Sequence, residues 1–158
     1  MTTLETRPAL ALPGQIDARG PRFGAVITTV VLALTLLTLP STLSLVLLAA
    51  QTVVFALGAL VGLQAQPYGV LFRRVVRPRL APPTRFEDQA PPRFAQSVGL
   101  VFAVVGLLGL LTGVTAVAYV AVAFALAAAF LNAAFDFCLG CEMYLLGRRL
   151  VGSRSAAA

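Results

Sequence analysis

Four long apolar runs decide what kind of fold this sequence can adopt. Strongly polar side chains are few within them, Gln51, Asn132 and Asp136 among these, so no run has the polar face of an amphipathic helix from a soluble protein. Each run is close to the roughly 17 to 25 residues that a helix needs to cross a bilayer. The sequence therefore predicts an all-α integral membrane four-helix bundle. The predicted crossings are about residues 23–39, 42–63, 94–111 and 114–137.

Composition excludes several other classes of protein. The chain of 158 residues is 59% hydrophobic, with a mean hydropathy of +0.91, and only 11% of it is charged. An ordinary soluble domain has roughly 25% charged residues, so a soluble helical bundle is rejected. Every basic residue is an arginine and there is no histidine, which excludes imidazole metal ligands and histidine catalysis. No basic stripe with interleaved aromatic residues is present, so nucleic acid is not an expected partner.

The distribution of arginine predicts the orientation. Four crossings place segments 1–22, 64–93 and 138–158 on one side, and only the turns near Pro40 and Gly113 on the other. By the positive-inside rule the first side is cytoplasmic, in a multi-pass protein of the cell inner (plasma) membrane with both termini in the cytoplasm. All of the arginines belong to that side: Arg7, Arg19, Arg22, Arg73, Arg74, Arg77, Arg79, Arg85, Arg93, Arg148, Arg149 and Arg154.

The segments outside the crossings divide into arms, linkers and surface helices. We expect a flexible N-terminal arm over residues 1–22, a membrane domain over 23–152 and a flexible tail over 153–158. Residues 64–93 are predicted to be a linker with an interfacial helix, and about 142–152 to be a second, C-terminal interfacial helix. Apolar residues interleaved with arginine are typical of helices that bind anionic lipid headgroups. The residues expected to contact lipid are Arg73, Arg74, Arg77, Arg79, Arg148 and Arg149.

The sequence also contains an internal repeat. Asp, Pro, Arg and Phe recur at equal spacing in residues 17–24 and 88–95, and each copy precedes two apolar runs and an arginine pair. The repeat predicts two tandem helical hairpins that run in the same sense. When the arginine pairs are aligned, Cys138 and Cys141 stand opposite Leu63 and Gln66. The cysteine pair is therefore the main chemical difference between the halves.

Cys138-Leu-Gly-Cys141 is the candidate catalytic motif. Its spacing suits a disulfide if Gly140 gives backbone freedom, two thiolates on one metal, or a thiol that resolves a persulfide. If the fourth helix ends near Phe137 and another begins near Glu142, the helix dipole favours thiolate. If one helix runs straight through, the dipole disfavours it. The sequence leaves both arrangements open, and either cysteine can be the attacking one.

Other roles for this region also stay open. Asp136 is a candidate catalytic proton acceptor for a thiol, or it marks the membrane boundary. The cysteines can instead be small packing residues. A zinc site would need two more ligands, and Asp136 and Glu142 are the only acidic residues near the pair, so no metal site is predicted within one chain. Small-residue spacings at 58–62 and 109–113 permit close helix packing, within the chain or in a homo-oligomer.

Several motifs together resemble a known family. Residues 17–23, 67–74, 91–96, and 130–135 followed by Cys138-Leu-Gly-Cys141-Glu-Met-Tyr are similar to the bacterial membrane family called domain of unknown function 4395. The resemblance covers roughly residues 15–149. It implies a bacterial inner-membrane protein and carries no activity or cofactor. The architecture is also distantly similar to the four-helix DoxX and MauE membrane proteins, which are linked to thiol and sulfur chemistry.

Two hypotheses follow for function. In the first, Cys138 and Cys141 exchange electrons or sulfane sulfur with a thioredoxin-like or rhodanese-like cytoplasmic protein. In the second, the chain is a non-enzymatic scaffold or transporter-like subunit, whose arginine-rich face binds lipid or a partner protein and whose cysteines only pack. The sequence specifies no cofactor for either.

Overall fold

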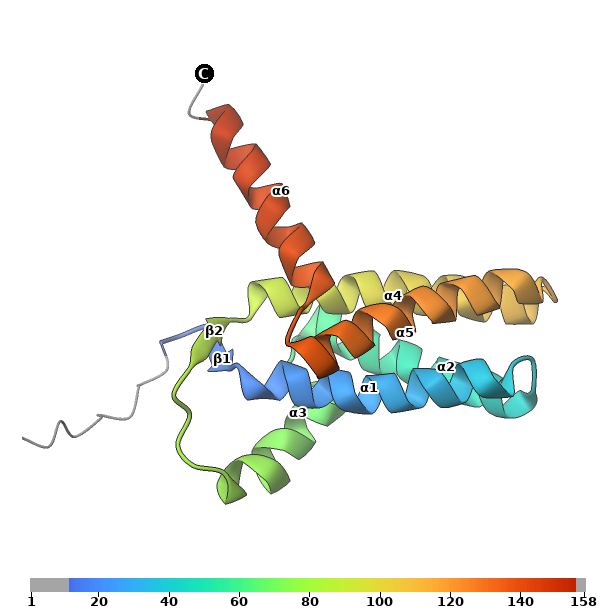
Figure 1. The fold of residues 1–158 in the computed structure, drawn as a ribbon, viewed down its shortest axis with the longest axis horizontal. Helices are drawn as coiled ribbons and strands as arrows, with labels where there is room; N and C mark the ends of the chain where they lie inside the picture. The colour runs from blue at the N-terminus through green and yellow to red at the C-terminus, as the bar shows by residue number, and fades with distance from the viewer. Residues whose placement is uncertain (1–11, 156–158) are drawn as a thin grey trace, which may run out of the picture.

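Four long helices correspond to the four apolar runs (Figure 1). In the computed structural model, which describes residues 12–155, each of the four is long and apolar enough to cross a membrane. α1 and α4 each begin four residues before the predicted run. Their boundary prolines lie in the first turn, where the helix needs no amide hydrogen. The long helices are α1 (Arg19–Thr38), α2 (Thr42–Ala56, continued by a π-helical turn, Leu57–Val61), α4 (Ala90–Leu111) and α5 (Thr115–Phe135).

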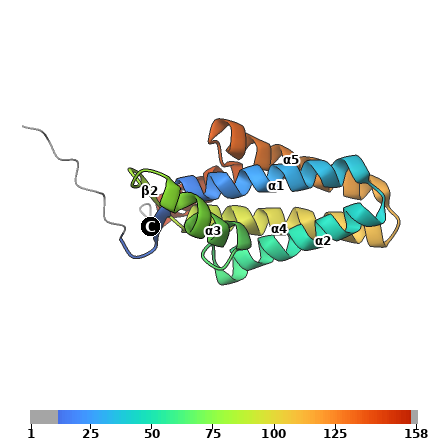
Figure 2. The same ribbon diagram turned by 90° about the horizontal axis from the view of Figure 1, so that it is seen from below.

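The four helices close a ring. α1 and α4 each contact both α2 and α5, and the turns that join α1 to α2 and α4 to α5 lie at the same end of the bundle (Figure 1 and Figure 2). Leu32, Leu48 and Val122 are almost completely buried at the centre. The outside is also apolar, as Leu37 and Phe135 are 81% and 68% exposed. A bundle that is apolar on its exterior is matched to a hydrocarbon solvent.

The two turns use the local chemistry that the sequence indicates. Ser41 caps α2, because its hydroxyl accepts a hydrogen bond of 3.3 Å from the amide of Ser44. Gly113, between α4 and α5, has a positive φ of 76°, which glycine adopts without a steric penalty.

A polar network links three of the helical elements inside the bundle. Gln51 is 1% exposed, and its Oε1 accepts a hydrogen bond of 2.9 Å from the hydroxyl of Tyr68. Its Nε2 lies 3.5 Å from Oγ1 of Thr28, and nearby the amide of Gln66 donates to Gln96 at 2.9 Å. These contacts give the buried amides partners and so remove the cost of burying them in an apolar surrounding.

Two further helical segments begin at the opposite end from the turns (Figure 1). α3 (Pro67–Leu71) continues as a π-helical turn (Phe72–Val76) and a 3₁₀ turn (Arg77–Arg79). α6 (Leu139–Ser155) projects away from the bundle and is longer at both ends than the surface helix predicted over about 142–152. Both segments are helical where the sequence predicts surface helices.

A two-stranded sheet at the same end was not predicted. β1 (Gln15–Asp17) pairs antiparallel with β2 (Phe86–Asp88), and Ile16 lies opposite Glu87. The flexible arm expected over residues 1–22 is therefore wrong for 15–22, which form β1 and the start of α1. Residues 64–93, expected to be a linker with an interfacial helix, also contain β2 and the start of α4. Residues 1–11 of the expected arm and 156–158 of the expected tail lie outside the described residues, while 153–155 are helical.

The sheet relates the two halves of the chain symmetrically. Asp17 and Asp88 occupy equivalent positions in the repeat. Oδ1 of Asp17 accepts from the amide of Arg19 at 3.1 Å, and Oδ1 of Asp88 accepts from the amide of Ala90 at 2.9 Å. Ile16 and Glu87 are also repeat equivalents, and they face each other across the ladder. The local two-fold axis therefore passes between Ile16 and Glu87.

Two repeat-equivalent arginines cross between the halves. Arg22 at the start of α1 donates from Nε to the carbonyl of Ala133, near the end of α5, at 3.1 Å. Arg93 at the start of α4 donates to the carbonyls of Ala59 and Leu60, where α2 ends, at 2.9 and 2.8 Å. A cation at a helix C-terminus satisfies carbonyls that lack helical partners and interacts favourably with the dipole. Each half therefore caps the second helix of the other.

This arrangement predicts that Arg93 contributes to stability. We expect Arg93→Gln to lower the free energy of unfolding by about 1 to 2 kcal/mol, because it removes two charge-assisted hydrogen bonds at a helix end. The measurement is unfolding followed by circular dichroism in mixed micelles. Arg74→Gln, on the exposed turn after α3, is the matched control and should change the free energy little. Equal losses in the two variants would contradict this role for Arg93.

Candidate functional site: the cysteine pair at the start of α6

The chain breaks between α5 and α6. α5 ends at Phe135, and Asp136 has a left-handed backbone with φ 55°. The amides of Asp136 and Phe137 both donate to the carbonyl of Leu131, which closes the end of the helix. α6 then begins at Leu139. The arrangement with one continuous helix is therefore excluded, and the break comes slightly earlier than residues 137 to 142.

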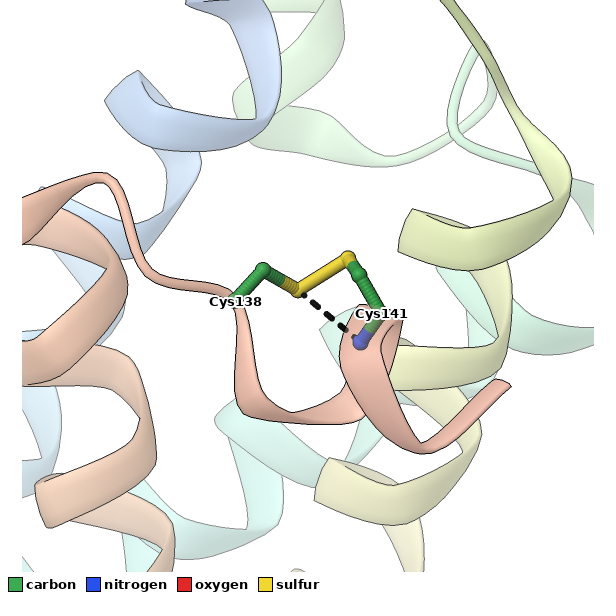
Figure 3. The surroundings of a disulfide bond; sticks show 2 residues. All are labelled: Cys138 and Cys141. Carbon is green, nitrogen blue, oxygen red and sulfur yellow. Dashed lines mark hydrogen bonds between the residues drawn. A yellow bond between two sulfur atoms is a disulfide. The ribbon is translucent and has the colours of Figure 1, made fainter. Parts of the chain in front are cut away.

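The break places both cysteines at the N-terminus of α6. Cys138 precedes the first helical residue and Cys141 lies in the first turn, and the two form a disulfide with a Cα–Cα distance of 5.2 Å (Figure 3). The amide of Cys141 donates to Sγ of Cys138 at 3.3 Å, and the amide of Glu142 donates to the Cys138 carbonyl at 3.0 Å. Cys138 thus acts as the cap of α6. A helix N-terminus that points at this sulfur favours negative charge on it when the bond is reduced.

Gly140 fixes α6 against α4. A Cβ at this position would lie 2.7 Å from both Cα and Cβ of Ala95, so only glycine permits this approach. One turn further along, the rings of Phe94 and Tyr144 pack with their centroids 5.7 Å apart. The glycine that the sequence suggested for ring closure therefore has a second role, because it lets α4 hold the cysteine turn in place.

The disulfide faces a cavity that we call the polar cavity. Its volume is about 270 Å³, and both cysteines line it while each remains half-buried. Its walls come from strand β2, from the starts of α1, α4 and α6, and from the end of α5. A half-buried disulfide in such a cavity is accessible to a thiolate while part of its surroundings excludes water. The charged residues that line the polar cavity are Arg22, Arg85, Glu87, Asp88, Asp136 and Glu142.

Asp136, the proton acceptor suggested by the sequence, lines the polar cavity but is exposed. Its Oδ2 lies 4.0 Å from Nη1 of Arg85, and 54% of its side chain is accessible. The structure therefore brings Asp136 to the cavity of the cysteines, and its role as a proton acceptor stays a prediction.

Glu87 is the acidic residue that the sequence analysis missed. It lies in β2, is half-buried and lines the polar cavity with both cysteines. Burial raises the pKa of its carboxyl above the ordinary value; Arg85 opposes this shift, and the nearby Asp136 and Asp17 add to it. A carboxyl with a raised pKa in the cavity of a disulfide accepts a proton more readily than an ordinary glutamate does. Its signal in the sequence is the repeat, since the equivalent residue is Ile16.

The first half contains an equivalent cavity without this chemistry. It also has a volume of about 270 Å³ and is lined by Ile16, Leu63 and Gln66, the residues that the repeat aligns with Glu87, Cys138 and Cys141. Asp17, Arg73 and Arg77 line it as well. The two halves therefore present similar cavities, of which only the second has thiols and a carboxyl with a raised pKa.

The arginines predicted to bind lipid do not form one cluster. Arg73 donates to the carbonyl of Gln64 at 2.6 Å, and Arg79 to that of Val75 at 2.6 Å. Arg74 and Arg77 are exposed, and Arg148 and Arg149 lie on α6, away from the bundle. Their contact with lipid stays a prediction.

Residues that could hold a metal do not gather in the part of the chain that the structure describes. Over that part, no group of three or more cysteine or acidic side chains has the arrangement to bind an ion. The thiols are instead bonded to each other.

The family model of the domain of unknown function (DUF4395) matches residues 16–149. The chain belongs to this family. The matched part of this DUF4395 protein runs from β1 into α6 and so includes both cavities and the cysteine pair, which confirms the resemblance drawn from the motifs. No curated protein and no solved structure matches the chain.

The close contact at Gly140 gives a testable consequence. We expect Gly140→Ala to destabilise the protein by about 1 to 3 kcal/mol and to slow closure of the disulfide, because the new methyl group overlaps Ala95. The measurements are thermal unfolding in detergent and the rate of oxidation of the reduced protein.

The control for Gly140→Ala is Gly147→Ala on the same helix, where a Cβ meets nothing within 4 Å. Alanine there should stabilise α6 by up to about 1 kcal/mol through its higher helix propensity. If the two substitutions had the same effect, the packing of α6 on α4 would not position the cysteines.

Proposed function

We propose that this DUF4395 protein spans the inner membrane four times, as two duplicated helical hairpins, with the strands, α3 and α6 at the cytoplasmic face. The arginine distribution supports this orientation. The matching hydrogen bonds of Asp17 and Asp88, and of Arg22 and Arg93, support the duplication. Such symmetric contacts are expected when two copies of one hairpin pack about an axis along the membrane normal.

We also propose that the protein is a membrane-bound thiol–disulfide exchange partner of a cytoplasmic, thioredoxin-like protein. The observation that carries this proposal is the position of Cys138 and Cys141 at the N-terminus of α6 in the polar cavity. Helix amides that stabilise a thiolate make its cysteine a better leaving group and a ready nucleophile. A pair that served only for packing would not need this placement.

In the proposed exchange Cys138 is the attacking residue. Its thiolate attacks a partner disulfide, so one S–S bond breaks as the mixed disulfide forms. Cys141 then attacks Sγ of Cys138, releases the partner as a dithiol and leaves the internal disulfide seen here. Two electrons pass to the partner, and the proton lost by Cys141 must be accepted locally. Glu87, in the same cavity, is the proposed acceptor.

The first test measures thiol reactivity. In inside-out membrane vesicles, after reduction, both cysteines should react with a small alkylating reagent, and oxidant should abolish the reaction by closing the disulfide. Cys138→Ser should leave no mixed disulfide with a thioredoxin-like probe, while Cys141→Ser should trap one. Vesicles of opposite orientation serve as the control with an impermeant reagent.

Two results would overturn this assignment. Cysteines that stay unreactive and never form a disulfide would leave the arginine-rich scaffold as the function. Trapping by Cys138→Ser, and not by Cys141→Ser, would reverse the roles of the two thiols.

The second test concerns Glu87 and pH. Because its pKa is raised, the carboxyl is protonated over a wider acidic range, and the rate of disulfide closure should fall as pH drops through that pKa. Glu87→Gln should slow closure about tenfold or more at neutral pH and remove this inflection.

Asp136→Asn is the control for Glu87→Gln, because Asp136 lines the same cavity but is solvated. It should keep the inflection. If Asp136→Asn removed the inflection and Glu87→Gln kept it, the proton acceptor would be Asp136.

A further inference from the structure

A second cavity reaches the disulfide from inside the bundle. This bundle cavity lies between α1, α4, α5 and the first turn of α6, has a volume of about 240 Å³ and extends from Cys138 to Phe55 and Phe102. Cys138 and Asn132 line both the bundle cavity and the polar cavity. The disulfide therefore has a polar space on one side and an apolar space on the other.

Small side chains keep the bundle cavity open. Ala25, Ala125, Ala128 and Ala129 form part of its wall, where longer apolar residues would fill the space and add packing contacts. Phe124 of α5 also lines it and is 61% exposed on the outside of the bundle. In the proposed membrane arrangement the cavity thus opens toward lipid, so a bilayer-soluble molecule can enter it.

Asn132 gives the bundle cavity a polar group, and it lines the cavity together with Cys138. Among the described residues its amide has no hydrogen-bond partner, and it is half-buried on the last turns of α5. A lipid acyl chain has no acceptor for this amide. A flat ring with carbonyl oxygens does, and such a ring also fits between aromatic and alanine side chains.

We propose that the bundle cavity binds the headgroup of a membrane quinone, which takes electrons from the reduced cysteine pair. This deepens the proposed function and rests on it. In the step, the S–H bonds of Cys138 and Cys141 break and the S–S bond forms. The quinone gains two electrons and two protons and leaves as the quinol. With the quinone as electron acceptor, the exchange described above runs in the reverse direction. A cytoplasmic dithiol reduces the internal disulfide and itself becomes a disulfide, so electrons pass from cytoplasmic thiols to the quinone pool.

Oxidation by a quinone tests this site. The reduced protein, in lipid nanodiscs without oxygen, is mixed with decylubiquinone while quinol absorbance and free thiols are followed. We expect one quinol for each disulfide formed. Ala128→Phe, which fills the cavity, should slow the reaction at least tenfold, and Asn132→Leu should raise the quinone concentration for half-maximal rate at least fivefold. The matched control is Ala127→Phe, an exposed neighbour on α5 outside the cavity.

Two further measurements separate this proposal from the exchange function. Exchange with a soluble dithiol should be unchanged in Ala128→Phe, which also checks that the variant folds. Saturable labelling by a photoreactive quinone should persist in a Cys138→Ser, Cys141→Ser protein and be lost when Ala128→Phe is added. Equal quinone oxidation in Ala127→Phe and Ala128→Phe, or labelling that ignores the cavity, would overturn the quinone site and leave dithiol exchange standing. Labelling without any thiol reactivity would support the site and overturn the exchange function.

Discussion

The last turn of α5 leaves carbonyls without helical partners, and Arg22 reaches from α1 to bind one of them. A cation at a helix C-terminus gives such a carbonyl a hydrogen-bond partner and interacts favourably with the helix dipole. A cap at this point lets α5 stop at Phe135 and lets the chain reverse through Asp136. The start of α6, and with it the position of Cys138, follows from that stop. The thiol site thus depends on a contact between segments 111 residues apart.

Comparison of the two halves shows where the chemistry is specific to one of them. Arg22 and Arg93 make equivalent contacts, and both halves enclose a cavity beside the sheet. Glu87 and the cysteines differ in type from their equivalents in the first half, although they occupy the same places. The scaffold is therefore common to the halves, and the reactive groups are confined to one. A site of this kind can change its side chains without changing the helices that hold it.

The four long helices could be predicted because their signal is local: run length and apolar composition together indicate a helix. The break before Cys138 could not be predicted. A left-handed backbone such as that of Asp136 is uncommon for residues other than glycine, and an apolar run with one aspartate also fits a continuous helix. β1 and β2 have three residues each, too few to show alternation, and their pairing partners are far apart in the sequence. The sequence therefore did not indicate Glu87, because only the pairing of β1 with β2 brings it to the cysteines.

The sheet also has an electrostatic consequence that joins the two halves. Asp17 lines the first cavity, pairs with Arg19 at 2.8 Å, and its negative charge raises the pKa of Glu87 across the ladder. The half without thiols is thus an electrostatic neighbour of the half with them, because a charge in the first cavity acts on the carboxyl that lies beside the cysteines in the second.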